Sequence, residues 1–248
     1  MDLGLGGRRV AVAAASAGLG FASAMALAEE GARVVICGRD RARIDDAAAR
    51  IGHGCVPLVQ DVSDARGGEA FVAAATEALG GLDIVVANGG GPAPGTFAST
   101  PLDAYPSALD LSLLSVVGMA KAAIPGMQEQ RWGRFVAITS LSVRQPIATL
   151  ILSNTARAGV TGFLKTVARE VAADGVTVNS VQPGLHDTDR VASLYGASLG
   201  AVAQGIPAGV LGSAADFGAV VTFLCSEQAR YVTGLQLHVD GGAYAALQ

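Results

Sequence analysis

Residues 9–30 read RVAVAAASAGLGFASAMALAEE, and this stretch decides the fold. The apolar run 9–14 predicts a buried strand, and the alanine-rich run 19–30 predicts a helix. Between them, Gly18 and Gly20 let the backbone approach a ligand, and the amino end of the helix offers N–H groups and a positive dipole end. A strand, a glycine turn and a helix in this order predict a dinucleotide site, although the glycines alone would also fit a tight turn.

A second interpretation of the same region is an export signal. Residues 8–28 combine two arginines, an apolar stretch and Ala-x-Ala sites, which is the pattern of a twin-arginine leader. We favour the strand, because the fold needs it and because nucleotide binding explains the glycine spacing. Three widely spaced cysteines fit reduced thiols. The chain is therefore expected to be cytoplasmic, with no segment that approaches a membrane span.

The rest of the chain alternates strands and helices. This pattern predicts an α/β fold, a single-domain Rossmann-type doubly wound parallel sheet of about seven strands over residues 1–248, with helices on both faces and ligands at the carboxyl ends of the strands. The stretch 184–212 lacks a strand and is expected to be a mobile flap over the site. The expected strands are 9–14, 33–37, 55–59, 82–87, 134–139, 176–181 and 235–239, and the expected helices are 19–30, 40–51, 64–79, 102–130, 150–173 and 213–226.

Composition excludes several classes of function. The 248 residues are 51% hydrophobic and 15% charged, with a net charge of −4 and no block of Lys or Arg, so nucleic acid is not an expected partner. The three histidines are isolated and no His/Cys cluster has zinc spacing, so no metal is expected. A small-molecule substrate is the expected partner.

Five motifs together resemble those of the short-chain dehydrogenase/reductase (SDR) family, and specifically its 3-oxoacyl-carrier-protein reductase-like branch. The family's T-G-x-x-x-G-x-G appears as residues 13–20, with alanine at the first glycine, and the resemblance covers essentially the whole chain. It implies a coenzyme site and, through residues 239–242 (VDGG), a homotetramer, with a dimer as the alternative. The implied coenzyme-binding residues are Ala14, Ser16, Gly18, Leu19, Gly20, Asp61, Val62, Asn88, Gly89, Gly90, Pro183, Gly184 and Thr188.

The end of the second predicted strand bears on the choice of coenzyme. An acidic residue there would bind the ribose 2′-hydroxyl of NAD, whereas Arg39 can bind a 2′-phosphate, so NADP is expected. Asp40 next to it keeps NAD possible, and a solvated arginine is the alternative interpretation of Arg39.

The catalytic positions depart from the family. The resemblance implies a serine that polarises the carbonyl, which is Ser140, and an asparagine that anchors a relay water, which falls on Ser112 within a residue or two. The family's tyrosine, which donates the proton, falls on Ser153, and its lysine falls on Arg157, which could also hold the ribose of the coenzyme. An aliphatic hydroxyl is a weaker acid than a phenol, so these residues predict an oxyanion or carboxylate pocket with a weak general acid.

Alternatives remain open at these positions. Ser153 could cap its helix, with Arg157 facing solvent. His186 is a candidate proton donor, as are Asp187, Tyr195 and Tyr105. Asp187 also suits a cap for a short helix with Thr188, and the family's structural asparagine falls on Asn179, where strand bridging is expected.

Three functions follow. The first is NAD(P)-dependent oxidoreduction, with NADPH-linked reduction of a 3-oxoacyl or ketone carbonyl at an atypical centre. The second is a non-redox enzyme on the same scaffold, such as a lyase, isomerase, cyclase or dehalogenase. The third is a non-catalytic cofactor-binding subunit.

Overall fold

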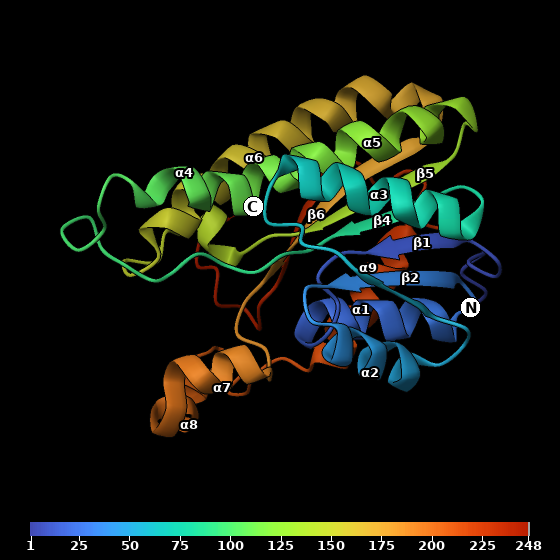
Figure 1. Ribbon diagram of the computed structural model, residues 1–248. Coiled ribbons are helices and arrows are strands. Elements are labelled where there is room, and N and C mark those ends of the chain that lie inside the picture. Colours follow the sequence, from blue (N-terminus) through green and yellow to red (C-terminus); the bar gives the residue numbers. More distant parts are fainter. Residues whose placement is uncertain (248) are drawn as a thin grey trace.

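The computed structural model describes residues 1–247, which form one parallel sheet covered on both faces by helices (Figure 1). The strand order is β3-β2-β1-β4-β5-β6-β7, so the chain reverses its direction of travel between β1 and β4. Side chains of such a sheet are buried on both faces, which explains the continuous apolar runs. The strands are β1 (Arg9–Val12), β2 (Arg33–Gly38), β3 (Val56–Val59), β4 (Ile84–Ala87), β5 (Gly133–Ile138), β6 (Val176–Pro183) and β7 (Gln236–Val239).

β1 contributes side chains to two apolar cores, because alternate side chains of a strand point to opposite faces of the sheet. Val10 and Val12 face a core shared with α1 (Gly18–Glu29), α2 (Arg41–Ile51) and α9 (Ala214–Cys225). Ala11 and Ala13 face the other core, which is shared with α3 (Ala65–Leu79), α5 (Ser115–Glu129) and α6 (Ile151–Val171). The doubly wound sheet predicted from the sequence is thereby confirmed, and β1 occupies part of the stretch that imitates a leader.

The prediction of a single helix over 102–130 is wrong in one respect. α4 (Ala104–Leu109) and α5 are joined by a π-helical turn, Asp110–Leu114, which inserts an extra residue into the helical ladder. The continuous span 104–129 is also long and apolar enough to cross a membrane, contrary to the expectation that no segment approaches this length. Half of its most apolar window is buried inside the fold, and a core helix meets the same criterion.

The stretch 184–212 contains helices and one isolated bridge. α7 (Asp189–Tyr195) and α8 (Leu199–Gln204), joined by a 3-10 turn at Gly196–Ser198, project from the sheet beyond β6 (Figure 1). His186 and Gly212 pair as the bridge and close the base of the excursion. Two further 3-10 turns lie at Leu141–Val143 and Ala172–Asp174.

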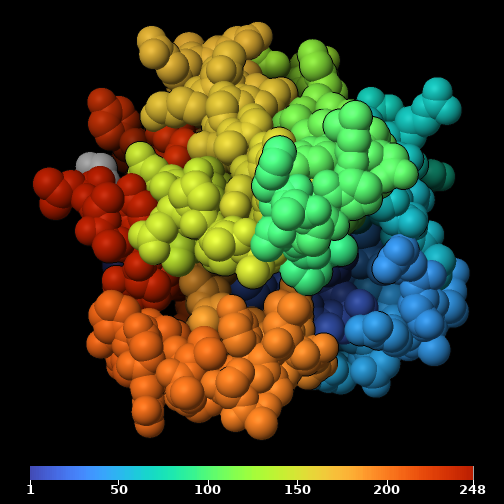
Figure 2. Space-filling view, turned by 90° about the vertical axis from the view of Figure 1, so that its left-hand side faces the viewer, coloured from blue at the N-terminus to red at the C-terminus, as the bar shows by residue number. Residues whose placement is uncertain are grey.

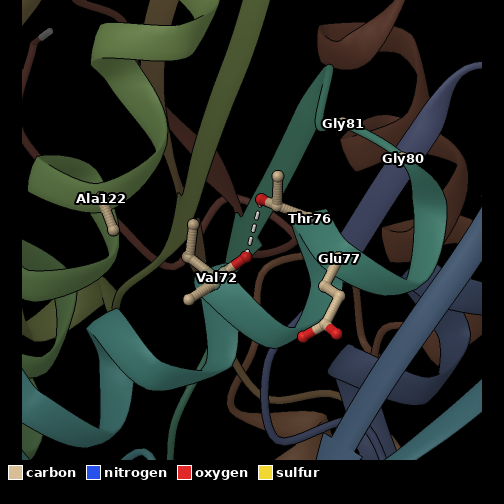
Figure 3. Close-up of a pocket in the computed structure, with 7 residues that line it drawn as sticks. Val72, Thr76, Glu77, Gly80, Gly81 and Ala122 are labelled. Carbon is tan, nitrogen blue, oxygen red and sulfur yellow. Dashed lines mark hydrogen bonds between the residues drawn. The ribbon is translucent and has the colours of Figure 1, made fainter.

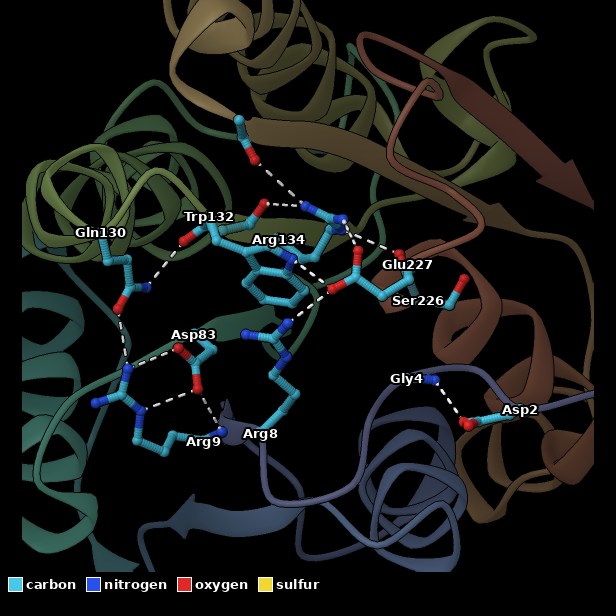
Figure 4. A network of polar contacts seen from close by, with 12 residues as sticks. Asp2, Gly4, Arg8, Arg9, Asp83, Gln130, Trp132, Arg134, Ser226 and Glu227 are labelled. Atoms are coloured by element: carbon cyan, nitrogen blue, oxygen red, sulfur yellow. Dashed lines mark hydrogen bonds and ion pairs between the residues drawn. The ribbon is translucent and has the colours of Figure 1, made fainter.

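A polar network closes the opposite, amino end of the sheet (Figure 4). Trp132 lies between the guanidinium groups of Arg8 and Arg134, at 3.6 and 4.2 Å from the ring centre. Glu227 accepts hydrogen bonds from Trp132 Nε1 at 2.8 Å and from Arg8 Nη2 at 2.7 Å. This network joins the segment after α9 to the starts of β1 and β5, far along the strands from their carboxyl ends.

Asn179, where strand bridging is expected, links β6 to the segment before β7. Its side chain donates to the carbonyl of Val232 at 2.8 Å and accepts from the N–H of Leu235 at 3.0 Å. These bonds fix the segment that leads into β7 against β6.

Candidate active site

The chain reversal between β1 and β4 places two loops side by side at the carboxyl edge of the sheet. Asn88, which follows β4, donates from its side chain to the carbonyl of Ala14, which follows β1, at 3.0 Å. Figure 2 shows this face: the excursion 184–212 lies opposite the segments around 91–110 and 141–155, with N-terminal residues visible in the hollow between them. Open α/β sheets bind ligands at this kind of switch point.

The amino end of α1 is suited to an anion. No described side chain caps this helix, its N-cap residue is Ala17 and its first turn carries no acidic residue. The neighbouring helices differ, because Asp40 caps α2 and Asp64 caps α3. The free N–H groups and the positive dipole end of α1 therefore remain available to a phosphate group.

Gly20 is required by close packing behind this turn. A Cβ atom there would lie 2.5 Å from Asn88 Nδ2 and 3.0 Å from the carbonyl oxygen of Ala14. Gly18 instead faces open space, where a Cβ would meet only the Thr188 methyl group at 3.8 Å. The glycine turn thus packs inward at Gly20 and leaves room at Gly18, next to Leu19, for a bound pyrophosphate. These features fit a dinucleotide coenzyme.

Ala14 has a left-handed backbone, with φ of +47°, where the resembled family has glycine. Its N–H group donates to the Cys37 sulfur at 3.4 Å. An alanine pays a steric penalty in this conformation that glycine does not. The turn therefore holds an alanine in a backbone conformation that glycine adopts at lower cost.

The end of β2 separates the roles of Arg39 and Asp40. The Asp40 carboxylate accepts the N–H of Arg43 at 2.9 Å as the cap of α2. Arg39 is exposed and makes no ion pair with any described residue, and Gly38 before it packs against Ser16. Arg39 is thus an unpaired cation beside the glycine turn, while the Asp40 carboxylate is bound to α2. This arrangement fits the 2′-phosphate of NADP better than the 2′-hydroxyl of NAD.

The loops after β3 and β6 complete this edge. Val62 is buried, whereas Asp61 is exposed and accepts from the N–H of Ser63 at 3.0 Å. Gly184, after Pro183, packs closely against Asp240. Thr188 caps α7 and brings its methyl group toward Gly18, so the excursion closes over the glycine turn.

His186 is packed rather than open. It is 3% exposed, its ring contacts Phe217 edge-on at 5.0 Å, and its Nδ1 lies 3.3 Å from the carbonyl of Gly184. Burial lowers the pKa of this histidine, with the Gly184 carbonyl opposing the shift. These contacts favour a structural role at the base of the excursion.

Three serines occupy the expected catalytic region. Ser140 follows β5 and accepts the N–H of Ser142 at 3.1 Å. Ser153 is 8% exposed and lies within the first turn of α6, which begins at Ile151, so the alternative that it caps the helix is wrong. Ser112 lies in the π-helical turn, and its buried hydroxyl has no protein partner among the described residues.

Arg157 points back to the strand ends and does not face solvent, contrary to the alternative interpretation. Its Nη1 donates to the carbonyl of Ile138 at 3.2 Å and its Nη2 to the carbonyl of Gly90 at 3.4 Å. Ile138 ends β5, and Gly90, beside Gly89, follows β4. Burial lowers the pKa of Arg157 to about 10, and the positive charge of Arg190 adds to the effect.

Arg190 was not predicted from the sequence. It lies in the first turn of α7, and its guanidinium covers Gly91, the residue next to Gly90. No motif marks it, because its position depends on how the excursion folds back. The hydroxyls of Tyr105 and Tyr195 make no hydrogen bond within residues 1–247.

The structure has two cavities to consider. One lies away from the carboxyl edge of the sheet, and the other only borders that edge. One of about 600 Å³ lies between α3 and α5, lined by Val72, Thr76, Glu77, Gly81 and Ala122, at the amino end of β4 (Figure 3). It holds none of the expected residues. The other, of about 410 Å³, borders Ala17, Gly18 and Thr188 on the outer side of α1. No group of three or more metal-ligating side chains occurs in the described part of the chain.

Comparisons with known proteins match this geometry. Residues 13–244 match the family model described as enoyl-(acyl carrier protein) reductase. The 3-oxoacyl-(acyl-carrier-protein) reductase of Vibrio cholerae is 34% identical over 242 residues, covering 98% of this chain and 99% of its own. Dehydrogenase/reductase SDR family member 4 of Oryctolagus cuniculus is 32% identical, covering 96% and 95%.

Solved structures agree. The L-sorbose reductase of Gluconobacter frateurii, described as complexed with NADPH and L-sorbose, has a TM-score of 0.93 and 28% identity, with full coverage of both chains. A Sinorhizobium meliloti protein assigned to the short-chain alcohol dehydrogenases has a TM-score of 0.92 and 32% identity, again with full coverage. The chain belongs to the short-chain dehydrogenase/reductase family, as its motifs predict.

Proposed function

We propose that this protein reduces the carbonyl group of a small molecule with NADPH. As a member of the SDR family it is an oxidoreductase. The observation that carries the proposal is the uncapped amino end of α1 at the chain reversal, with an unpaired Arg39 beside it. The glycine turn would hold the pyrophosphate, and Arg39 would bind the 2′-phosphate.

NADPH held at this site would supply hydride to the carbonyl carbon. The side chains of this chain would act on the carbonyl oxygen, on which negative charge develops. The hydroxyls of Ser140 and Ser153 would donate hydrogen bonds to it, and the Arg157 guanidinium would stabilise the charge. Arg157 keeps its own proton at neutral pH, so it acts by charge and not as an acid.

The proton must then reach the oxygen without a phenol at position 153. An aliphatic hydroxyl is too weak an acid to remain ionised after the step, so we infer that Ser153 gives its proton to the alkoxide as it takes one from a water molecule, and that solvent then protonates the hydroxide that is left. The buried hydroxyl of Ser112, which has no protein partner among the described residues, is suited to hold that water.

The names of the relatives bear on the substrate. The Vibrio protein is named as a reductase of 3-oxoacyl-(acyl-carrier-protein), and the Gluconobacter protein as a reductase of L-sorbose.

We propose a homotetramer in the cytoplasm, with a dimer as the alternative. Exposed small residues on α5 and α6, including Gly126, Ala158 and Gly162, leave faces on which helices of two copies could pack closely.

Coenzyme binding tests the proposal. Quenching of protein fluorescence and the fluorescence of the dinucleotide should show NADPH binding at least about tenfold tighter than NADH, because charge-assisted bonds to a phosphate contribute on the order of 1.5–3 kcal/mol. Arg39→Gln should remove this preference, and Arg169→Gln, which changes an exposed arginine on α6, should not. If neither dinucleotide binds, the proposed function is wrong.

A further inference from the structure

The two arginines at the active site converge on one short segment. Arg157 reaches Gly90 from α6, through the Nη2 bond to its carbonyl at 3.4 Å. Arg190 reaches Gly91 from α7, and a Cβ at Gly91 would collide with its guanidinium. Two positively charged groups on different elements thus meet over the loop after β4. Helix α7 belongs to the excursion that closes this edge of the sheet.

No carboxylate balances these charges. Within residues 1–247 neither guanidinium forms an ion pair, and no acidic group is among the influences on the pKa of Arg157. Two half-buried arginines at the amino end of the sheet differ, because Arg9 pairs with Asp83 and Arg8 pairs with Glu227. Arg157 is half-buried and Arg190 is exposed, so solvent screens part of the repulsion between them, and a bound anion would remove the rest.

The geometry favours a carboxylate as this anion. A guanidinium has five N–H donors, and two of those on Arg157 are bound to the carbonyls of Ile138 and Gly90. Three donors of this planar group remain, and they are suited to charge-assisted hydrogen bonds with a carboxylate. Ser153 lies one turn earlier on the same helix face, so the anion would lie next to the expected position of the reacting carbonyl.

We propose that the substrate is an oxo acid, whose carboxylate is bound by Arg157 and Arg190 while the neighbouring carbonyl is reduced. This inference rests on the proposed function and adds the substrate class. The coenzyme is the other possible source of an anion at this edge, because its pyrophosphate would lie at Gly18, near Thr188. The experiment therefore has to separate substrate carboxylate from coenzyme phosphate.

The probes are acetoacetate and its methyl ester, with 2-oxobutanoate and its methyl ester as a second pair. Each pair differs only in the negative charge. Titration calorimetry is done on the protein alone and on the protein with NADP⁺, and steady-state reduction is followed with NADPH. Each acid should bind at least about tenfold more tightly than its ester, since a charge-assisted pair contributes on the order of 1.5–3 kcal/mol.

Three variants assign the effect. Arg190→Gln and Arg157→Gln should each lower the preference for acid over ester at least about tenfold, and Arg157→Lys should restore part of it, because lysine keeps the charge but loses the planar group of donors. Arg169→Gln, an exposed arginine on the same helix as Arg157, is the matched control and should keep the full preference.

The outcomes separate the two proposals. If the acids and esters bind equally in both the free and the loaded protein, the oxo acid proposal is overturned even where NADPH still binds and reduces the esters. The same conclusion follows if Arg190→Gln weakens NADPH binding and leaves the acid preference unchanged. Conversely, acid-selective binding by a protein that fails to bind NADPH would support the anion site and reject the reductase.

Discussion

The amide of Asn88 and the carbonyl of Ala14 are joined by a hydrogen bond of 3.0 Å, and this bond holds together the two halves of the candidate active site. Ala14 belongs to the glycine turn after β1, and Asn88 to the loop that Arg157 contacts. The bond therefore links the glycine turn to the loop that Arg157 contacts.

Ala14→Gly should raise the free energy of unfolding by up to about 1 kcal/mol. The left-handed backbone at this residue costs an alanine about 1–2 kcal/mol, and the entropy that glycine loses on folding offsets part of the gain. Urea unfolding measures the change. Ala13→Gly, at a buried neighbour without a positive φ, should instead destabilise the fold, and a loss of stability in Ala14→Gly would contradict the strain.

The double variant Ser153→Tyr, Arg157→Lys should raise kcat for carbonyl reduction at least about tenfold. A phenol is a far stronger acid than an aliphatic hydroxyl, and positioned general acids contribute about 10²–10⁴-fold. Single-turnover reduction measured under excess NADPH isolates this step. Unchanged kcat in a folded double variant would mean that proton transfer to the carbonyl oxygen does not limit the parent enzyme.

His186 should make stability sensitive to acid. Its pKa is lowered in the folded state, so the unfolded chain binds the proton first as the pH falls through about 6.5. The stabilisation is present above that pH and is lost as the pH drops toward the folded-state pKa. Urea unfolding measures the free energy of unfolding at pH 7.5 and at pH 5. The difference between the two values should be smaller for His186→Leu than for the parent.

His53→Asn is the control for this titration, because His53 is exposed and asparagine tolerates its left-handed backbone. A change in pH dependence in this variant equal to that in His186→Leu would remove His186 as the cause.

Glu227→Gln should destabilise the fold by about 1 kcal/mol. The variant keeps an acceptor for Trp132 but loses the charge that pairs with Arg8 and lies 3.9 Å from the buried Arg134. The partial exposure of Glu227 limits the effect, since solvent screens such pairs. Thermal unfolding measures this loss of stability. The control is Glu170→Gln, which changes an exposed glutamate on α6 and should alter the free energy of unfolding by no more than about 0.5 kcal/mol.

Sequence patterns predicted all seven strands to within two residues at each end, because a buried parallel strand is a short apolar run with clear boundaries. The π-helical turn at Asp110–Leu114 was missed, since one inserted residue hardly changes a helical pattern in an apolar segment. A short helix next to Thr188 was expected and is α7, but α8 was missed, because both helices are short and their residues are mostly exposed, which weakens amphipathic periodicity.

The candidate site was predictable where a motif specifies the backbone. The glycine turn, Asn88 and Ser140 lie on the same edge of the sheet as expected. The direction of the Arg157 side chain and the position of Arg190 at the site were not predictable, because both depend on packing between elements distant in sequence. The role of Asp40 as a helix cap could be recognised only in the structure, since the sequence Arg39-Asp40 alone is compatible with either NAD or NADP.

The placement of β1 between β2 and β4 has a consequence for synthesis of the chain on the ribosome. The first three strands are translated first, and one edge of β1 has no partner until β4 follows. An open strand edge can pair with other chains, and the pairing of β4 with β1 closes it. The loops after these two strands carry Ala14 and Asn88, so the edge closes in the same step that brings the two halves of the candidate active site together.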